Sequence, residues 1–108
     1  MAKFPFEEIT DDVQAAAVRA LHGLEKKVEH FLVHFDVDVI NYDEFPAVDV
    51  GHRPGLTLAQ AKEAVGVFTS SKKSVGLVVA EFNAAHDTDG ALAEALIDII
   101  EEAIVSKR

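Results

Sequence analysis

Carboxylate side chains end two apolar segments of this 108-residue chain. Asp36 and Asp38 close the apolar part of LVHFDVDVINYDEFP, residues 32–46. Along an extended chain they share one face and lie about 7 Å apart. Two like charges so close are costly unless a cation lies between them, and hard oxygen donors suit magnesium or manganese. Asp36 and Asp38 are therefore candidate metal ligands; the alternative is a solvated pair of aspartates at a strand end.

Glu81 and three histidines are the other candidate site residues. Glu81 interrupts the apolar run VGLVVAEF, where an unpaired carboxylate would be costly. It therefore lies at the rim of a sheet, or it meets a cation or a donor-rich substrate. His34 shares a strand face with Asp36, while His52 and His86 fall in predicted loops near that rim. Imidazole beside carboxylates suits manganese, iron or zinc, although each histidine could equally be a hydrogen-bonded structural residue.

The spacing of apolar residues predicts three strands that alternate with three helices. The strands cover residues 3–9, 31–37 and 75–82, and the helices cover 11–27, 57 to about 70, and 87 or 88 to the SKR at the end. Thr10 is the expected N-cap of the first helix, and Thr57 with Gln60 has the spacing of a capping box. The last strand is almost entirely apolar, which predicts burial on both faces.

This order, β-α-β-α-β-α, predicts an α/β fold with a short parallel sheet in a single domain over residues 1–108. Ligands of such sheets bind beyond the carboxyl ends of the strands, so Asp36, Asp38 and Glu81 are expected at one rim. The acidic loop from about 40 to 56 is long enough to suggest a functional role. The exposed edges of so small a sheet favour association with other protein.

Composition excludes several classes of partner. The chain has 10 basic and 19 acidic residues, a net charge of −9 and no basic stripe, which argues against nucleic acid and anionic membranes. It has no cysteine, so disulfides and thiolate metal sites are excluded. No apolar run approaches the roughly 18 residues of a membrane span, and the N-terminus lacks the apolar core of a signal peptide. A cytoplasmic location is predicted.

The motifs VHFDVDVINYDEFP, GHRPGLTLAQAKEAVG and VVAEFNAAHD together resemble the last third of the ureohydrolases, which include arginase, agmatinase and formiminoglutamase. The resemblance covers residues 3–105 and implies part of a three-layer α/β sandwich whose site holds two manganese ions. It implies that Asp36 bridges the two metals, that Asp38 binds one of them, and that Glu81 holds the guanidinium group of the substrate. Water activated by the metals would attack the guanidinium carbon, and urea would leave.

The chain departs from the pattern of these enzymes in three places. Asn41 and Tyr42 stand where the family usually has Asp-Pro, and RPGLT has one glycine fewer than the family's PGGLT. The upstream histidine and the Asp-x-His-x-Asp strand, which carry the other metal ligands, have no counterpart. We therefore expect a C-terminal segment of an amidinohydrolase for arginine, agmatine or formiminoglutamate. Alone it should be inactive, bind manganese weakly or not at all, and form a homo-oligomer or pair with the missing N-terminal part.

Two alternatives remain open. FLVHFDVDVI also resembles the D-x-D motif of haloacid-dehalogenase-type phosphatases, in which Asp36 would be the nucleophile, Asp38 the general acid and magnesium the cofactor. The later acidic pair of that family has no evident counterpart, and Ile40 stands where it usually has threonine or valine. The other alternative is a non-catalytic α/β module that self-associates through its sheet edges.

Overall fold

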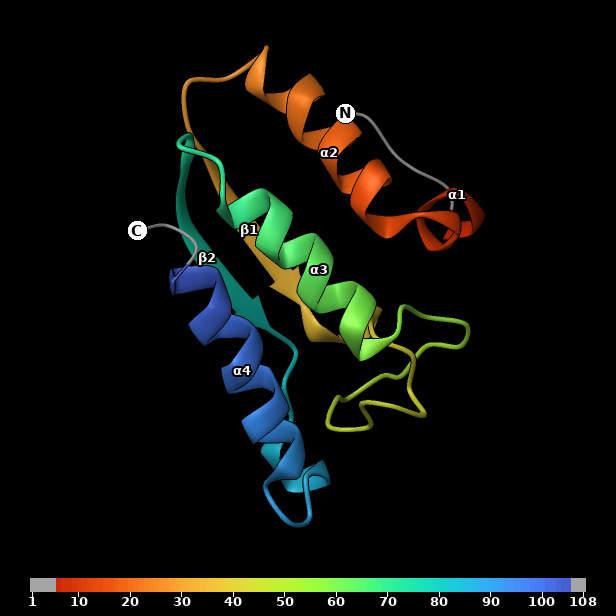
Figure 1. Ribbon diagram of the computed structural model, residues 1–108. Coiled ribbons are helices and arrows are strands. Elements are labelled where there is room, and N and C mark those ends of the chain that lie inside the picture. The colour runs from red at the N-terminus through yellow and green to blue at the C-terminus, as the bar shows by residue number, and fades with distance from the viewer. Residues whose placement is uncertain (1–5, 106–108) are drawn as a thin grey trace.

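The computed structural model describes residues 6–105, in which two parallel strands pack against helices (Figure 1). The helices are α1 (Phe6–Asp11), α2 (Val13–Glu25), α3 (Leu58–Thr69) and α4 (Ala91–Val105), the strands are β1 (Phe31–Asp36) and β2 (Ser74–Ala80), and the short 3-10 turns are η1 (Val37–Val39) and η2 (Ala84–His86). The predicted α/β class with a short parallel sheet is confirmed.

The first predicted strand is wrong over residues 6–9, which form most of α1, while residues 3–5 lie outside the described part of the chain. A helix satisfies its own backbone hydrogen bonds, whereas a strand needs a neighbour for them. Glu8 also pairs with Arg19 of α2 at 2.9 Å, which holds the two helices together. The described chain therefore has the order α-α-β-α-β-α.

Asp12, and not Thr10, caps α2. The Asp12 carboxylate accepts a hydrogen bond from the backbone N–H of Ala15 at 3.1 Å. Thr10 lies within α1, where its hydroxyl donates to the carbonyl of Phe6 at 3.0 Å. Since α2 begins after this cap, it spans Val13–Glu25 rather than the predicted residues 11–27.

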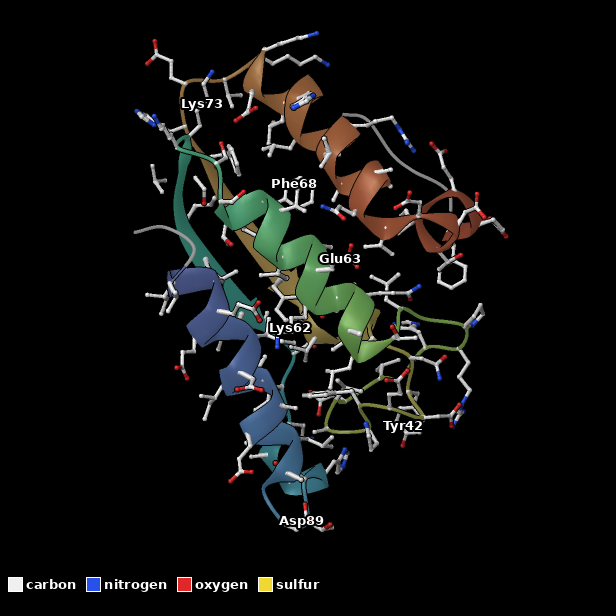
Figure 2. The ribbon with its side chains drawn as sticks, in the orientation of Figure 1. Tyr42, Lys62, Glu63, Phe68, Lys73 and Asp89 are labelled. Atoms are coloured by element: carbon white, nitrogen blue, oxygen red, sulfur yellow. The ribbon has the colours of Figure 1, made fainter. Side chains whose placement is uncertain are left out.

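The capping box predicted at the start of α3 is confirmed. The hydroxyl of Thr57 accepts from the N–H of Gln60 at 3.0 Å, and the side chain of Gln60 accepts from the N–H of Thr57 at 2.9 Å. Phe68 points from α3 toward α2 (Figure 2), whereas Ala61 and Val65 are buried in the main core. α3 therefore packs between α2 and the sheet.

The last helix begins later than predicted, at Ala91 instead of residue 87 or 88. Asp87 still acts as its cap, because its carboxylate accepts from the N–H groups of Leu92 at 3.1 Å and Ala93 at 2.9 Å. Gly90, the residue directly before α4, turns the chain into the helix with a positive φ of 78°, a conformation that glycine adopts at little cost. Within residues 6–105, no helix is long and apolar enough to cross a bilayer.

The two strands pair in parallel from Phe31 opposite Ser74 to Asp36 opposite Ala80. Both α3 and α4 lie over the same face of this sheet (Figure 1). On that face Phe35 is buried and Val79 packs against the same core.

The opposite face of the sheet is open in the described chain. Leu32 is 62% exposed and Val78 is 44% exposed. The prediction of a strand over 75–82 that is buried on both faces is therefore wrong: β2 ends at Ala80, and its alternate residues face out.

The loop between β1 and α3 contributes a large part of the core. Ile40, Phe45, Ala47 and Val48 are each no more than 2% exposed. They form one cluster with buried residues of β1, α3 and α4, including Ile99. The loop that carries the candidate site is thus anchored by its own apolar side chains.

Candidate active site at the carboxyl rim of the sheet

Asp36 and Asp38 lie where the chain leaves β1. Asp36 is the last residue of the strand, and Asp38 lies in the turn Val37–Val39. The Asp36 Oδ1 atom accepts the backbone N–H of Asp38 at 3.3 Å. The predicted extended pair on a strand face is wrong, because this turn folds Asp38 back toward Asp36.

The Asp36 carboxyl group acts electrostatically on Asp38. Burial raises the pKa of Asp38, and the hydrogen bond and negative charge of Asp36 raise it further; Glu81 adds to the shift and His52 opposes it. The pKa of Asp38 is thus higher in the folded chain than in the unfolded chain. As the pH rises from the unfolded pKa through the folded pKa, Asp38 ionises and the folded chain loses stability. A cation among these carboxylates would relieve the repulsion.

Glu81 follows β2 directly and has an unusual backbone conformation. Its φ is 71°, in the left-handed region, which costs a non-glycine residue on the order of 1–3 kcal/mol. The side chain is exposed at the carboxyl end of the sheet, and its charge acts on Asp38. Such strained residues cluster at functional sites, so this conformation favours a functional reading of Glu81.

The three histidines predicted near the rim have different surroundings. His52 Nε2 lies 3.7 Å from Asp38 Oδ2, an ion-pair distance that is too long for a hydrogen bond. His34 is exposed on the open sheet face. His86 Nδ1 lies 2.9 Å from the carbonyl oxygen of Val48, so this ring ties η2 to the loop. Of the three, it is His52 that lies within ion-pair distance of a candidate metal ligand.

Asn41 joins the two ends of the loop, a role that was not predicted from the sequence. Its N–H donates to the carbonyl of Leu56 at 2.7 Å, and its Oδ1 accepts from the N–H of Gly55 at 3.0 Å. Its Nδ2 donates to Asp43 at 3.1 Å. The turn preference of asparagine, with a glycine at the far end of the loop, is the signal that could have indicated this role.

A second set of contacts joins the two arms of the loop near Tyr42, which is labelled in Figure 2. The N–H of Tyr42 donates to the carbonyl of His52 at 3.0 Å. The Arg53 guanidinium lies 4.7 Å from the centre of the Tyr42 ring and makes a two-pronged ion pair with Asp43, with its shortest contact at 2.7 Å. The Arg53 cation lowers the pKa of Asp43 through these hydrogen bonds. These contacts therefore hold the backbone beside His52 in place.

The residues present fit only part of a metal site. Asp36 and Asp38 offer hard oxygen donors of the kind that manganese accepts, and their repulsion favours a cation. Within residues 6–105, however, no three His, Asp or Glu side chains are grouped to hold a metal ion. The described residues therefore offer a pair of candidate carboxylate ligands but form no complete metal site.

Comparison with known families decides what kind of chain this is. A model of the arginase family matches residues 1–106. The chain belongs to the arginase family. The resemblance drawn from the D-V-D, G-L-T and E-F-N motifs is confirmed, and the phosphatase alternative, which depended on the D-V-D motif alone, loses its basis.

Solved structures of arginase-family enzymes share this fold. Helicobacter pylori arginase is 19% identical, with a TM-score of 0.85 over 97% of this chain and 35% of that one. Trypanosoma cruzi formiminoglutamase, solved with Mn²⁺, is 16% identical, with a TM-score of 0.78 over 93% and 34%. The agmatine ureohydrolase of Thermoplasma volcanium is 18% identical, with a TM-score of 0.74 over 93% and 32%. The comparison with curated proteins found no match.

The chain spans about a third of the length of these arginase-family structures. At such low identities, the likeness establishes the fold and not a substrate.

Proposed function

We propose that this arginase-family chain is the C-terminal segment of a binuclear-manganese amidinohydrolase that hydrolyses a linear guanidino compound. The observation that carries the proposal is the carboxylate pair Asp36 and Asp38 at the end of β1, with Glu81 acting on it from the end of β2. A relative solved with Mn²⁺ supports the choice of metal.

Each carboxylate has a separate role in this proposal. Asp36 would bridge the two metal ions, and Asp38 would bind one of them. Glu81 would hold the guanidinium group by charge-assisted hydrogen bonds, which are stronger than those between neutral groups. When bound, two manganese ions supply an activated water and stabilise the charge that develops during hydrolysis. The remaining ligands would come from protein outside this chain, so the chain alone should be inactive.

Titration of the ¹⁵N-labelled chain with Mn²⁺ tests the metal site. We expect weak binding, reversed by dialysis, with paramagnetic broadening centred on the amides of Asp36 and Asp38. Asp38→Asn should weaken binding at least about tenfold, since it removes a charged hard donor. Asp98→Asn on α4, which makes the same chemical change far along the chain, should leave binding unchanged. Broadening centred elsewhere, or equal effects of both variants, would contradict the proposed site.

Hydrolysis assays complete this test. With Mn²⁺ present, the chain should release no more urea from arginine or agmatine, and hydrolyse no more formiminoglutamate, than Mn²⁺ alone. The physical reason is that two carboxylates cannot fix two ions in the geometry that activates water. Robust turnover by the chain alone would show that its site is complete.

The open sheet face supports association with a second copy or with the N-terminal part of the enzyme. Leu32 and Val78 expose apolar surface there, and burial of an exposed apolar patch favours association with other protein. In sedimentation velocity we expect species larger than the monomer, and Leu32→Lys should reduce them. Ile97→Lys is the matched control, because Ile97 is 58% exposed on α4 rather than on the sheet. A monomer at every concentration would exclude self-association.

A further inference from the structure

The segment that follows β2 is fastened to the middle of the 40–57 loop by contacts that have no part in the proposed chemistry. The backbone N–H of Asn83 donates to the carbonyl of Ala47 at 2.7 Å, and Asn83 Nδ2 donates to Asp49 Oδ1 at 2.6 Å. His86 Nδ1 lies 2.9 Å from the carbonyl oxygen of Val48. Ala47 and Val48 are no more than 2% exposed, so the loop side of this junction belongs to the core.

The side chain of Asn83 binds in two directions at once. Its Oδ1 atom accepts the N–H of Ala85 at 3.0 Å, at the start of the turn η2, while its Nδ2 atom reaches Asp49. Asparagine combines an acceptor oxygen with a donor amino group, and both are used here. Alanine at this position could keep the backbone bond to Ala47 but neither side-chain bond. Aspartate could keep the bond to Ala85 but would lose the donor that Asp49 needs.

Glu81 lies between this junction and the end of the sheet, where Ala80 pairs with Asp36. If the strand continued, Glu81 would point to the same face as Val79, which packs against the core. An unpaired carboxylate there would be costly. The left-handed φ of 71° changes the course of the chain, and Glu81 is exposed instead. Such a conformation persists only where the surrounding structure enforces it.

We propose that Asn83 is the positioning residue of the Glu81 carboxylate: its two side-chain hydrogen bonds hold the chain after β2 on the course that requires the left-handed backbone at Glu81. Asn83 acts through Glu81 and does not touch the substrate. The inference rests on the proposed function, in which the Glu81 carboxylate meets a guanidinium group beside Asp36 and Asp38. A carboxylate that is already in place loses less conformational freedom when that group binds.

An exchange of two side chains tests this inference in the metal-free, ¹⁵N- and ¹³C-labelled chain. Asn83→Asp keeps the acceptor for the N–H of Ala85 but places a second carboxylate against Asp49. Adding Asp49→Asn reverses donor and acceptor, so the double variant can restore the bond at the net charge of the parent chain. The readout is the NOE between the amide proton and the Hα of Glu81, which is strong when φ is positive because these two protons are then closest.

In Asn83→Asp we expect this NOE to fall to less than about half of its parent intensity, because the left-handed conformation loses its anchor. The double variant should restore it. Gln14→Glu makes the same amide-to-carboxylate change at an exposed position of α2 and should leave the NOE unchanged. A merely structural role of Asn83 would lower the free energy of unfolding without changing the Glu81 NOE in the folded chain.

The inference is overturned by an unchanged NOE in folded Asn83→Asp, by an equal loss in Gln14→Glu, or by a parent chain without the strong NOE. If Asn83→Asp alone does not fold, the double variant decides: a folded chain with the parent NOE supports the inference, and failure to fold or to show that NOE overturns it. Failure of Mn²⁺ binding at Asp36 and Asp38 would remove the proposed function and alter none of these results. The two failures are therefore distinguishable.

Discussion

Replacing Phe45 with alanine should lower the free energy of unfolding by about 3–5 kcal/mol, the usual cost of emptying a buried phenylalanine site. Phe45 is fully buried although it lies in a loop, and its ring is 6.1 Å from that of Phe82, just after Glu81. The side chain therefore joins the two loops that follow β1 and β2. Domains are stable by only about 5–15 kcal/mol, so the loss is large.

Urea unfolding followed by circular dichroism measures this effect. Val50→Ala, in the same loop at a 65% exposed position, should change the free energy of unfolding by less than about 0.5 kcal/mol. A loss below about 1 kcal/mol for Phe45→Ala would mean that the loop folds independently of the core.

Gly55→Ala should destabilise the chain by about 1–3 kcal/mol, the range for overpacking a filled site. A Cβ atom at Gly55 would lie 2.6 Å from the backbone nitrogen of Asn41 and 2.7 Å from its Cα. Neither atom can move freely, because the Asn41 N–H donates to Leu56 at 2.7 Å. The added methyl group must therefore push the two ends of the loop apart.

The matched control for Gly55→Ala is Gly23→Ala in α2. A Cβ atom at Gly23 meets nothing within 4 Å. Alanine in a helix is favoured over glycine by about 1 kcal/mol, so this variant should be more stable than the parent. Thermal unfolding of the two variants should therefore show shifts of opposite sign. Shifts of the same sign would contradict the close approach at Gly55.

Features that depend only on neighbouring residues in the sequence were predicted correctly. The capping box at Thr57 needs only Gln60 three residues later, and it forms as predicted. The strand predicted at residues 3–9 failed over its described part because a strand also needs a neighbour, which local sequence does not specify. Where no partner lies alongside, Glu8 and its neighbours form a helix.

The sequence indicated which residues are candidates for the site, but it did not indicate their geometry. The rule for parallel sheets placed Asp36 and Glu81 at the same end of the sheet, and the charge of Glu81 does act on Asp38. The two-residue period of a strand did not predict the 3-10 turn at Val37–Val39, in which the Asp36 carboxylate accepts a hydrogen bond from the backbone N–H of Asp38.

The burial of the 40–57 loop could not be predicted from the sequence, for a different reason. Phe45, Ala47 and Val48 follow neither a helical nor a strand period, so no pattern indicates which way they face. Only the packing of β1, α3 and α4 around them makes them core residues.

A loop that is part of the core belongs to the same cooperative unit as the sheet. Ile40 and Phe45 cannot leave the interior without breaking its packing, and the pairing of Ile40 with Leu56 would break with them. The loop is therefore unsuited to act as a moving lid over the rim. Admission of a ligand would depend instead on rotation of exposed side chains such as His52, a motion of picoseconds to nanoseconds, and not on slow opening of the backbone.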